Sequence, residues 1–177
     1  MDAPGAEDAP ALFELIGGSD REVVTASLRW DGPDDISEIE SWIERCRVNP
    51  FGESGFHWVI RDTSGELTGT SGQAMGSIGT RPLGVAGRAD VGYWLGRPYW
   101  GRGIMSEALS ALLRFGFDAL GYAKIEAEVF LNNTRGLRLA ESVGMLRERV
   151  VRRGHRKRGI WVDAALYGIL PEDLPQR

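Results

Sequence analysis

The chain has 177 residues, of which 42% are hydrophobic and 26% charged, and this size and balance predict a single domain over residues 1–177. The formal net charge of −4 provides no overall field that would draw the protein to nucleic acid. Cys46 is the only cysteine, which excludes an internal disulfide and favours a reducing compartment.

Targeting signals are not expected either. Residues 1–18 are acidic and lack the basic and apolar regions of a signal peptide. No stretch approaches the roughly 18 uninterrupted apolar residues that cross a membrane. The expectation is a cytoplasmic protein that does not bind a membrane.

The first half of the chain predicts two helices followed by strands. The helices are expected over residues 7–16 and 34–47, and the second places its apolar residues at the i, i+3, i+4 spacing of one helix face. Residues 55–76 predict two strands joined by a hairpin turn at 63–65. A further strand is expected over 88–96.

The second half alternates helices and strands. The expected elements are a helix over 103–121 with Gly121 at its C-terminal cap, a strand over 124–131, a short helix over 133–145, and a closing antiparallel pair, 146–154 and 159–170, around the segment 155–158. This order predicts an α/β (α+β) domain with a mixed β-sheet flanked by helices.

The segment 96–103, GRPYWGRG, lies between an expected strand and the strongest expected helix. Gly101 and Gly103 lack the β-carbons that would keep an anion away from the backbone N–H groups of a helix N-terminus. Two interpretations are open, a plain strand-to-helix turn and a phosphate-binding loop. A Walker loop is excluded because Arg102 and Gly103 follow Gly101, and a dinucleotide fingerprint because Ser106 replaces its third glycine.

Two longer motifs, DVGYWLGRPYWGRGIMSEAL and NNTRGLRLAESVGM, resemble the GNAT acetyltransferase superfamily. More narrowly they resemble its ribosomal-protein N-terminal acetyltransferase (RimJ/RimL-like) branch, over residues 7–172. The resemblance implies the GNAT fold, a mixed central sheet flanked by helices. Relatives begin with an edge strand ahead of the first helix, and this chain is expected to lack it, which leaves a sheet edge open and a homodimer possible in principle.

The same resemblance implies an N-acetyltransferase that moves the acetyl group of acetyl-CoA to a primary amine by direct attack in a ternary complex. A protein or peptide N-terminal α-amine is the expected acceptor. Two alternatives are open: a small-molecule amine such as an aminoglycoside or polyamine, and a non-catalytic acyl-CoA binding module. No metal is expected.

Site residues follow from the family pattern Gln/Arg-x-x-Gly-x-Gly/Ala, which aligns to residues 98–103 with Pro98 in place of its leading residue. The resemblance implies that backbone amides of the loop bind the pyrophosphate of acetyl-CoA. It also implies that the strand before the loop pairs with the pantetheine arm. The expected cofactor-binding residues are Tyr93, Trp94, Leu95, Trp100, Gly101, Arg102, Gly103, Ile104, Met105 and Asn133.

The catalytic groups are less clearly marked. Asp90 stands where relatives often carry a glutamate, so it is either the general base or a surface carboxylate paired with Arg88. Asn133 is either a cofactor contact or a helix N-cap. Many relatives place a tyrosine, as general acid, where this chain has Ala140.

Other polar groups have several interpretations. Glu126 and Glu128 share one strand face as a polar surface or an acceptor-pocket lining. The two histidines, His57 and His155, lie far apart in the sequence and give little support to a zinc site or a catalytic triad.

The basic run 147–158 is interpreted as a solvated hairpin, a contact for the acceptor or an acidic partner, or, as the least favoured option, a nucleic-acid site. Trp30 and Trp94 are the expected substrate-binding residues by family position.

Overall fold

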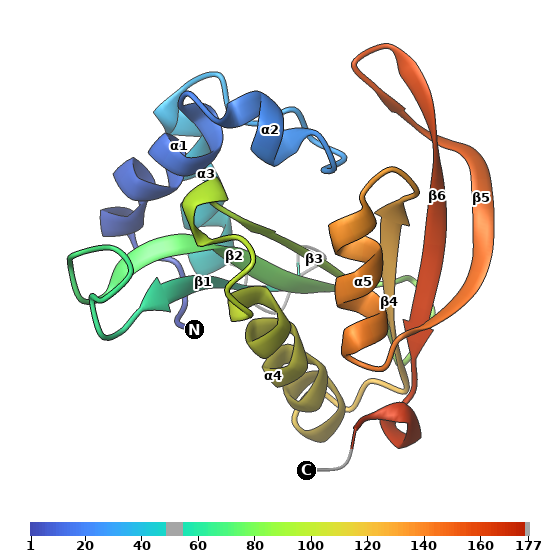
Figure 1. Cartoon of the computed structure of the whole chain (residues 1–177). Coiled ribbons are helices and arrows are strands. Elements are labelled where there is room, and N and C mark those ends of the chain that lie inside the picture. The colour runs from blue at the N-terminus through green and yellow to red at the C-terminus, as the bar shows by residue number, and fades with distance from the viewer. Residues whose placement is uncertain (49–54, 176–177) are drawn as a thin grey trace. The chain divides into compact units, whose positions relative to one another are not determined.

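A computed structural model describes residues 1–48 and 55–175 of the chain. Its strands are β1 (Phe56–Asp62), β2 (Gln73–Pro82), β3 (Arg88–Leu95), β4 (Lys124–Phe130), β5 (Leu146–Lys157) and β6 (Ile160–Ile169). Its α-helices are α1 (Ala9–Gly17), α2 (Arg21–Thr25), α3 (Ile36–Val48), α4 (Ile104–Asp118) and α5 (Thr134–Ser142). The strands form a sheet in the order β1-β2-β3-β4-β6-β5 (Figure 1).

The sheet is mixed, as the sequence predicts. β3 pairs with β4 in parallel, with Arg88 opposite Lys124 and Asp90 opposite Glu126. β6 pairs antiparallel with both β4 and β5. None of the described helices is long and apolar enough to cross a bilayer.

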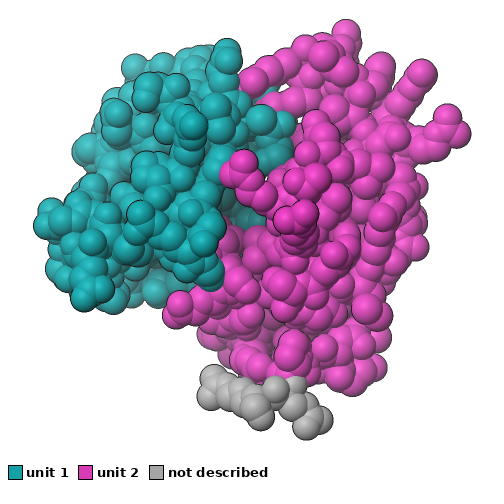
Figure 2. Space-filling model, in the orientation of Figure 1, with its two compact units in different colours: residues 1–79, 93–104 teal, residues 80–92, 105–177 magenta. Residues whose placement is uncertain are grey.

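The chain divides into two compact units, coloured separately in Figure 2. Unit 1 contains residues 1–79 and 93–104, and unit 2 contains residues 80–92 and 105–177. β2 and β3 each contribute residues to both units.

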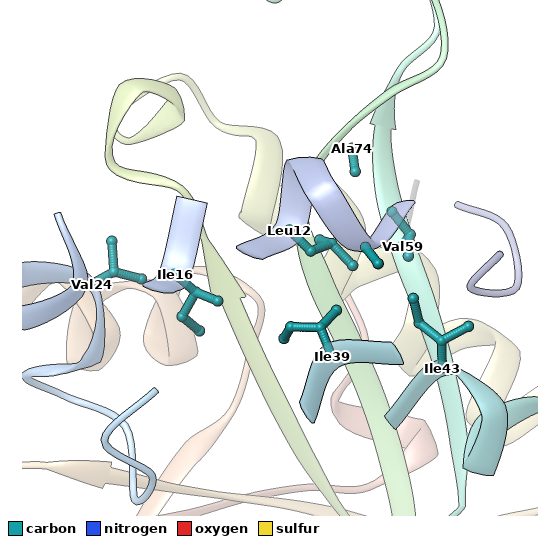
Figure 3. Close-up of a cluster of buried hydrophobic side chains, with 8 residues drawn as sticks. Leu12, Ile16, Val24, Ile39, Ile43, Val59 and Ala74 are labelled. Atoms are coloured by element: carbon teal, nitrogen blue, oxygen red, sulfur yellow. The ribbon is translucent and has the colours of Figure 1, made fainter. Parts of the chain in front are cut away.

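Helices α1, α2 and α3 supply most of the apolar core of unit 1 (Figure 3). Leu12 and Ile16 of α1 are fully buried, and Ile39 and Ile43 of α3 lie in the same cluster. This confirms the helix expected over residues 7–16 and the amphipathic face expected for residues 34–47. Each such side chain contributes roughly 1.5–3 kcal/mol when it leaves water. The five-residue helix α2 was not predicted.

No strand precedes α1 in the described part of the chain. Asp2 instead forms one antiparallel bridge with Val59, with N···O distances of 3.2 and 2.8 Å. Arg61 of β1 also binds the N-terminal segment: its Nη2 donates to Asp8 Oδ2 at 2.9 Å, and its Nε lies 3.2 Å from Asp2 Oδ2. In the described chain, a single residue thus bridges to β1 where the resemblance implied an edge strand.

The connection between β1 and β2 is longer than the predicted turn at 63–65. β1 ends at Asp62 and β2 begins at Gln73, so residues 63–72 form the loop. Burial by itself would raise the pKa of Asp62. Hydrogen bonds from the Leu67, Thr68 and Gly65 backbone and from the Ser64 hydroxyl outweigh it and lower the pKa to about 2. A buried carboxylate therefore replaces the expected tight turn as the organiser of this hairpin.

In unit 2, α4 and α5 pack beside β4. A β-carbon at Gly116 of α4 would lie 2.7 Å from Ile125, so glycine allows this close approach. Tyr167 of β6 is fully buried, and its hydroxyl donates to Glu141 of α5 at 2.9 Å. Burial raises the pKa of Tyr167, so this hydroxyl stays protonated.

The closing hairpin differs from its prediction. The segment 155–158 was expected as the turn, but β5 continues to Lys157 and the turn consists of Arg158 and Gly159, with φ of 47° and 82°. Pairing between β4 and β6 reaches only Phe130 and Ala164, so the hairpin runs past the end of β4 (Figure 1). Most of the basic run 147–158 is exposed on it.

Candidate functional site

The glycine-rich loop leads into α4 and faces open space at two glycines. It follows a short 3₁₀ helix, Arg97–Tyr99, and α4 begins at Ile104. Gly101 and Gly103 have φ of 75° and 77°, a left-handed conformation that favours glycine. In the described structure, no atom lies within 4 Å of a β-carbon built at either glycine.

This geometry fits an anionic group. The first N–H groups of an α-helix have no partner within the helix and carry the positive end of its dipole. Arg102, between the two glycines, is exposed and adds a guanidinium to the same loop. Ile104 is half-buried, whereas the Met105 side chain is buried, so Met105 can offer only its backbone to a ligand.

The backbone groups at the end of β3 point alternately towards β2 and towards the opposite edge of the strand. Gly96 N donates to Met75 O of β2 at 2.9 Å, and the Trp94 carbonyl lies so close to β2 that a β-carbon at Gly76 would be 2.3 Å from it. Backbone groups alternate along a strand, so those of Tyr93 and Leu95 point to the edge opposite β2. Of the three residues expected to pair with pantetheine, Tyr93 and Leu95 direct their backbone groups to this edge, and the Leu95 carbonyl there accepts from Trp100.

Two of the candidate tryptophans are part of the packing of unit 1. Trp94 and Trp100 are half-buried and pack against its apolar core cluster. Trp100 Nε1 also donates to Leu95 O at 2.8 Å, which holds the loop against the end of β3. Trp30, the other expected substrate residue, is 42% exposed.

Asn133 caps helix α5, as one of its two interpretations predicts. Its Oδ1 accepts from Gly136 N at 3.0 Å. A β-carbon at Gly136 would lie 2.4 Å from the Asn133 amide, which explains the small residue at this position. The cap uses the oxygen only, so Nδ2 remains suited to donate to a carbonyl of a ligand.

Asp90 does not pair with Arg88 as its structural interpretation supposed. Its Oδ2 lies 2.6 Å from Arg81 Nη2, on the neighbouring strand β2, and its side chain is 21% exposed. Arg88 pairs with Glu126 instead, at 2.5 Å. The register of three strands, which local sequence does not encode, decides these partners.

Glu126 lies in a polar hollow of unit 2 rather than on an open surface. The side chain is buried and contacts Arg88 and Lys124. Burial alone would raise the pKa of Glu126, but hydrogen bonds from these two cations outweigh it and lower the pKa. The hollow has a volume of about 240 Å³ and is lined by Arg88, Lys124, Glu126, Glu148, Arg149 and Leu166.

Sequence reasoning missed a contact between Glu128 and His155. His155 Nε2 of β5 lies 2.9 Å from Glu128 Oε1 of β4. The two residues are separated by a helix and by the intervening strand β6, so no spacing in the sequence could have indicated it. His57, in unit 1, packs edge-on against Trp42. Within the described residues, no three His, Cys, Asp or Glu side chains form a metal-binding group.

The lone cysteine is a poor nucleophile. Burial raises the pKa of Cys46 to about 11, against a smaller opposing effect of Arg45. About one thiol in ten thousand with such a pKa is a thiolate at pH 7, and the thiolate is the reactive form.

Comparisons with known proteins identify the family. A model of the acetyltransferase (GNAT) domain matches residues 1–146. An uncharacterized N-acetyltransferase of Bacillus licheniformis, p20, is 30% identical over 171 residues, which cover 94% of this chain and 89% of the relative. The uncharacterized N-acetyltransferase YoaA of Bacillus subtilis (strain 168) is 30% identical over 167 residues, covering 93% and 88%.

Solved structures share the fold. Mycobacterium smegmatis RimJ, in complex with CoA-disulfide, superposes with a TM-score of 0.81 at 24% identity, over 98% of this chain and 82% of RimJ. The microcin C7 self-immunity acetyltransferase MccE, in complex with acetyl-CoA and AMP, superposes with a TM-score of 0.80 at 20% identity. The superposition covers 95% of this chain and 89% of MccE. The domain match and the two relatives together show that the chain belongs to the GNAT family and is an N-acetyltransferase that uses acetyl-CoA.

Proposed function

We propose that the protein acetylates the α-amino group of a peptide or protein N-terminus, by direct attack of the amine on acetyl-CoA. The observation that carries the cofactor assignment is the loop at Gly101 and Gly103, with its two left-handed glycines and the open space before them. Direct transfer is supported by the high pKa of Cys46, which disfavours an acetyl-cysteine intermediate.

The cofactor contacts follow from these local geometries. Backbone amides from Trp100 to Met105, with the Arg102 guanidinium, bind the pyrophosphate. The outward backbone groups of Tyr93 and Leu95 pair with the pantetheine arm, although the Leu95 carbonyl is already engaged by Trp100. Asn133 supplies its Nδ2 to a carbonyl of the same arm while its oxygen caps α5.

The acceptor argument rests on proton chemistry, because only a neutral amine attacks a thioester. An α-amino group with a pKa near 7.8 is roughly one-seventh neutral at pH 7, whereas a lysine near 10.4 is neutral in about one part in 2,500. An enzyme acting on lysine must therefore supply about 3.5 kcal/mol more. Ala140, where relatives carry a tyrosine, is fully buried and offers no acid.

The fold likeness to RimJ is consistent with membership of the ribosomal-protein acetyltransferase branch. The small-molecule alternative is supported by a different neighbour, since the MccE structure is a complex with AMP as well as acetyl-CoA.

A competition experiment separates these acceptors. One peptide carries a free N-terminus and blocked lysines, and its counterpart carries a blocked N-terminus and one free lysine. Both compete for acetyl-CoA at pH 7, with product measured by mass spectrometry. We expect preferential acetylation of the free N-terminus. Preferential acetylation of the lysine peptide would contradict the proposal. If neither peptide is acetylated but small amines are, the protein acts on small molecules instead.

A further inference from the structure

A carboxylate–imidazole pair lies at the end of β4 in unit 2. Glu128 Oε1 and His155 Nε2 are 2.9 Å apart, with side chains 17% and 22% exposed. The atoms lie off the line of a hydrogen bond, so the contact is electrostatic in nature. The ring of Phe130 lies 5.3 Å from the imidazole, centroid to centroid.

A distortion of β5 accompanies this placement of the imidazole. The pairing of β5 with β6 shifts between Val151 and His155, and Arg153, within the shift, has φ of 49°. Asp163 holds the distortion, because its Oδ1 accepts from Arg153 N at 2.7 Å and its carbonyl accepts from Leu131 N at 2.9 Å. β-bulges and left-handed non-glycine residues are common beside functional sites, where they redirect a side chain.

Strand β3, which pairs with β4 as far as Asp90 and Glu126, carries Gly92 two residues farther along. Arg88 of β3 and Glu126 of β4 contact each other, which places these side chains on one face of the sheet. Residues two apart on a strand lie on the same face. On β4 this places Glu128 on the face of Glu126, and on β3 it places Asp90 and Gly92 on the face of Arg88. In the described structure, no atom lies within 4 Å of a β-carbon built at Gly92. Gly92 therefore leaves open space at its own position on β3.

The two nitrogens of His155 have different surroundings. Nε2 is buried against Glu128, and among the described residues no hydrogen bond is made to Nδ1. A carboxylate at this distance favours the tautomer with its proton on Nε2, which leaves the lone pair of Nδ1 for the substrate. Phe130 of β4 lies beside the imidazole, and Val162 of β6 is the strand partner of His155. On β5 itself, the buried Lys157 follows two residues later.

His155 suits proton transfer better than Asp90 does. Imidazoles as a class exchange protons near neutral pH, where a general base is most effective. The Asp90 carboxylate is instead bound to the Arg81 guanidinium at 2.6 Å, so one of its oxygens is already engaged within the protein.

We infer that His155 is the general base of the acetyl transfer and that Glu128 is its positioning residue. The inference rests on the proposed function, and it holds for either class of amine. Nδ1 takes one proton from the substrate ammonium, which leaves a neutral amine. The amine nitrogen bonds to the thioester carbon as the carbon–sulfur bond breaks. The nitrogen then loses a second proton, which the departing thiolate takes up to form the thiol, and the imidazolium returns its own proton to water.

The test compares His155→Gln, His155→Ala and Glu128→Gln with wild type, using the preferred amine and measuring thiol release from pH 6 to 9. We expect kcat at pH 7 to fall by about 10²-fold or more in both His155 variants. The loss should shrink as the pH rises, since the amine then becomes neutral without help. Free imidazole should restore part of the activity of His155→Ala, and Glu128→Gln should lower kcat less than either His155 variant.

Two controls separate proton transfer from a structural role. His57→Gln removes the other imidazole, from unit 1, and should retain wild-type turnover. Calorimetric binding of acetyl-CoA should be unchanged in the His155 variants, which reports an intact fold. A His155→Gln enzyme within threefold of wild type across the pH range, or a His155→Ala loss that imidazole does not relieve, would overturn the inference. A wild-type enzyme that acetylates no amine would instead overturn the proposed function.

Discussion

At the scale of single residues, two glycines shape the loop before α4, which is proposed to bind an anion. Gly101 and Gly103 both need positive φ, and both face open space. A side chain there would strain the backbone and also occupy the space in which a phosphate is proposed to bind. These two effects can be separated, because Gly121, at the other end of α4, has φ of 67° and equally open surroundings.

Gly103→Val is expected to raise the Kd for acetyl-CoA tenfold or more. Tenfold corresponds to about 1.4 kcal/mol, within the range of one hydrogen bond to a charged group. Gly121→Val introduces the same kind of backbone strain outside the loop, so it should lower stability similarly and leave the Kd unchanged. Isothermal titration calorimetry measures both. If the folded Gly103→Val and Gly121→Val variants bind acetyl-CoA with the same Kd, the loop does not bind the phosphates.

Asp62 is expected to make stability depend on acid pH. Its folded pKa of about 2 is below the ordinary value near 3.9, so its contribution is fully present above pH 3.9 and is lost as the pH falls through 2. Asp62→Asn should lower the urea midpoint of unfolding at pH 7. The difference between the midpoints of wild type and variant should become smaller as the pH falls towards 2. Asp118→Asn, at an exposed position, serves as the control. A difference that stays constant down to pH 2 would contradict this role.

At the scale of elements, the β5–β6 hairpin carries a residue in an unfavourable conformation at its turn. Arg158 and Gly159 both have positive φ, the pattern of a type I′ turn, for which Asn-Gly is preferred. β5 reaches this turn through a bulge at Arg153 that also has positive φ. The hairpin thus has two strained positions, only one of which lies near the proposed base.

Arg158→Asn should stabilise the protein, because asparagine tolerates the left-handed conformation better than arginine does. A gain of about 0.5–1 kcal/mol would raise Tm by roughly 1–4 °C in a chain of this length. Differential scanning calorimetry measures the shift, and Gly159→Val should lower Tm by more. A lowered Tm in Arg158→Asn would show that the arginine side chain contributes more than the turn conformation costs.

At the scale of the whole molecule, the net charge of −4 combines two units of opposite sign. Unit 1 contains 15 acidic and 7 basic side chains, whereas unit 2 contains 10 acidic and 14 basic ones. Much of the basic surplus lies in the run 147–158 of the β5–β6 hairpin. The net charge of the whole chain therefore describes the surface of neither unit.

The family and the fold could be predicted from the sequence because the patterns that indicate them involve residues close together in the chain. The i, i+3, i+4 faces of α3 and α4, the glycines before α4 and the Asn133 cap each depend on residues a few positions apart. Such patterns persist in any structure that contains the helix. The domain match and the structural neighbours confirm the family and the mixed sheet that these motifs predicted.

The partners of polar side chains depended on long-range structure instead. Which cation meets Asp90 depends on the pairing of β2 with β3, and the position of His155 relative to Glu128 depends on a strand inserted between theirs and on a one-sided bulge. A shift of one residue in strand register turns every side chain to the opposite face. The sequence by itself thus determined most of the helices, the glycine-rich entry to α4 and the reaction class. Only the tertiary structure decided which charged groups meet, because strand register is set by the packing of distant segments and not by local spacing.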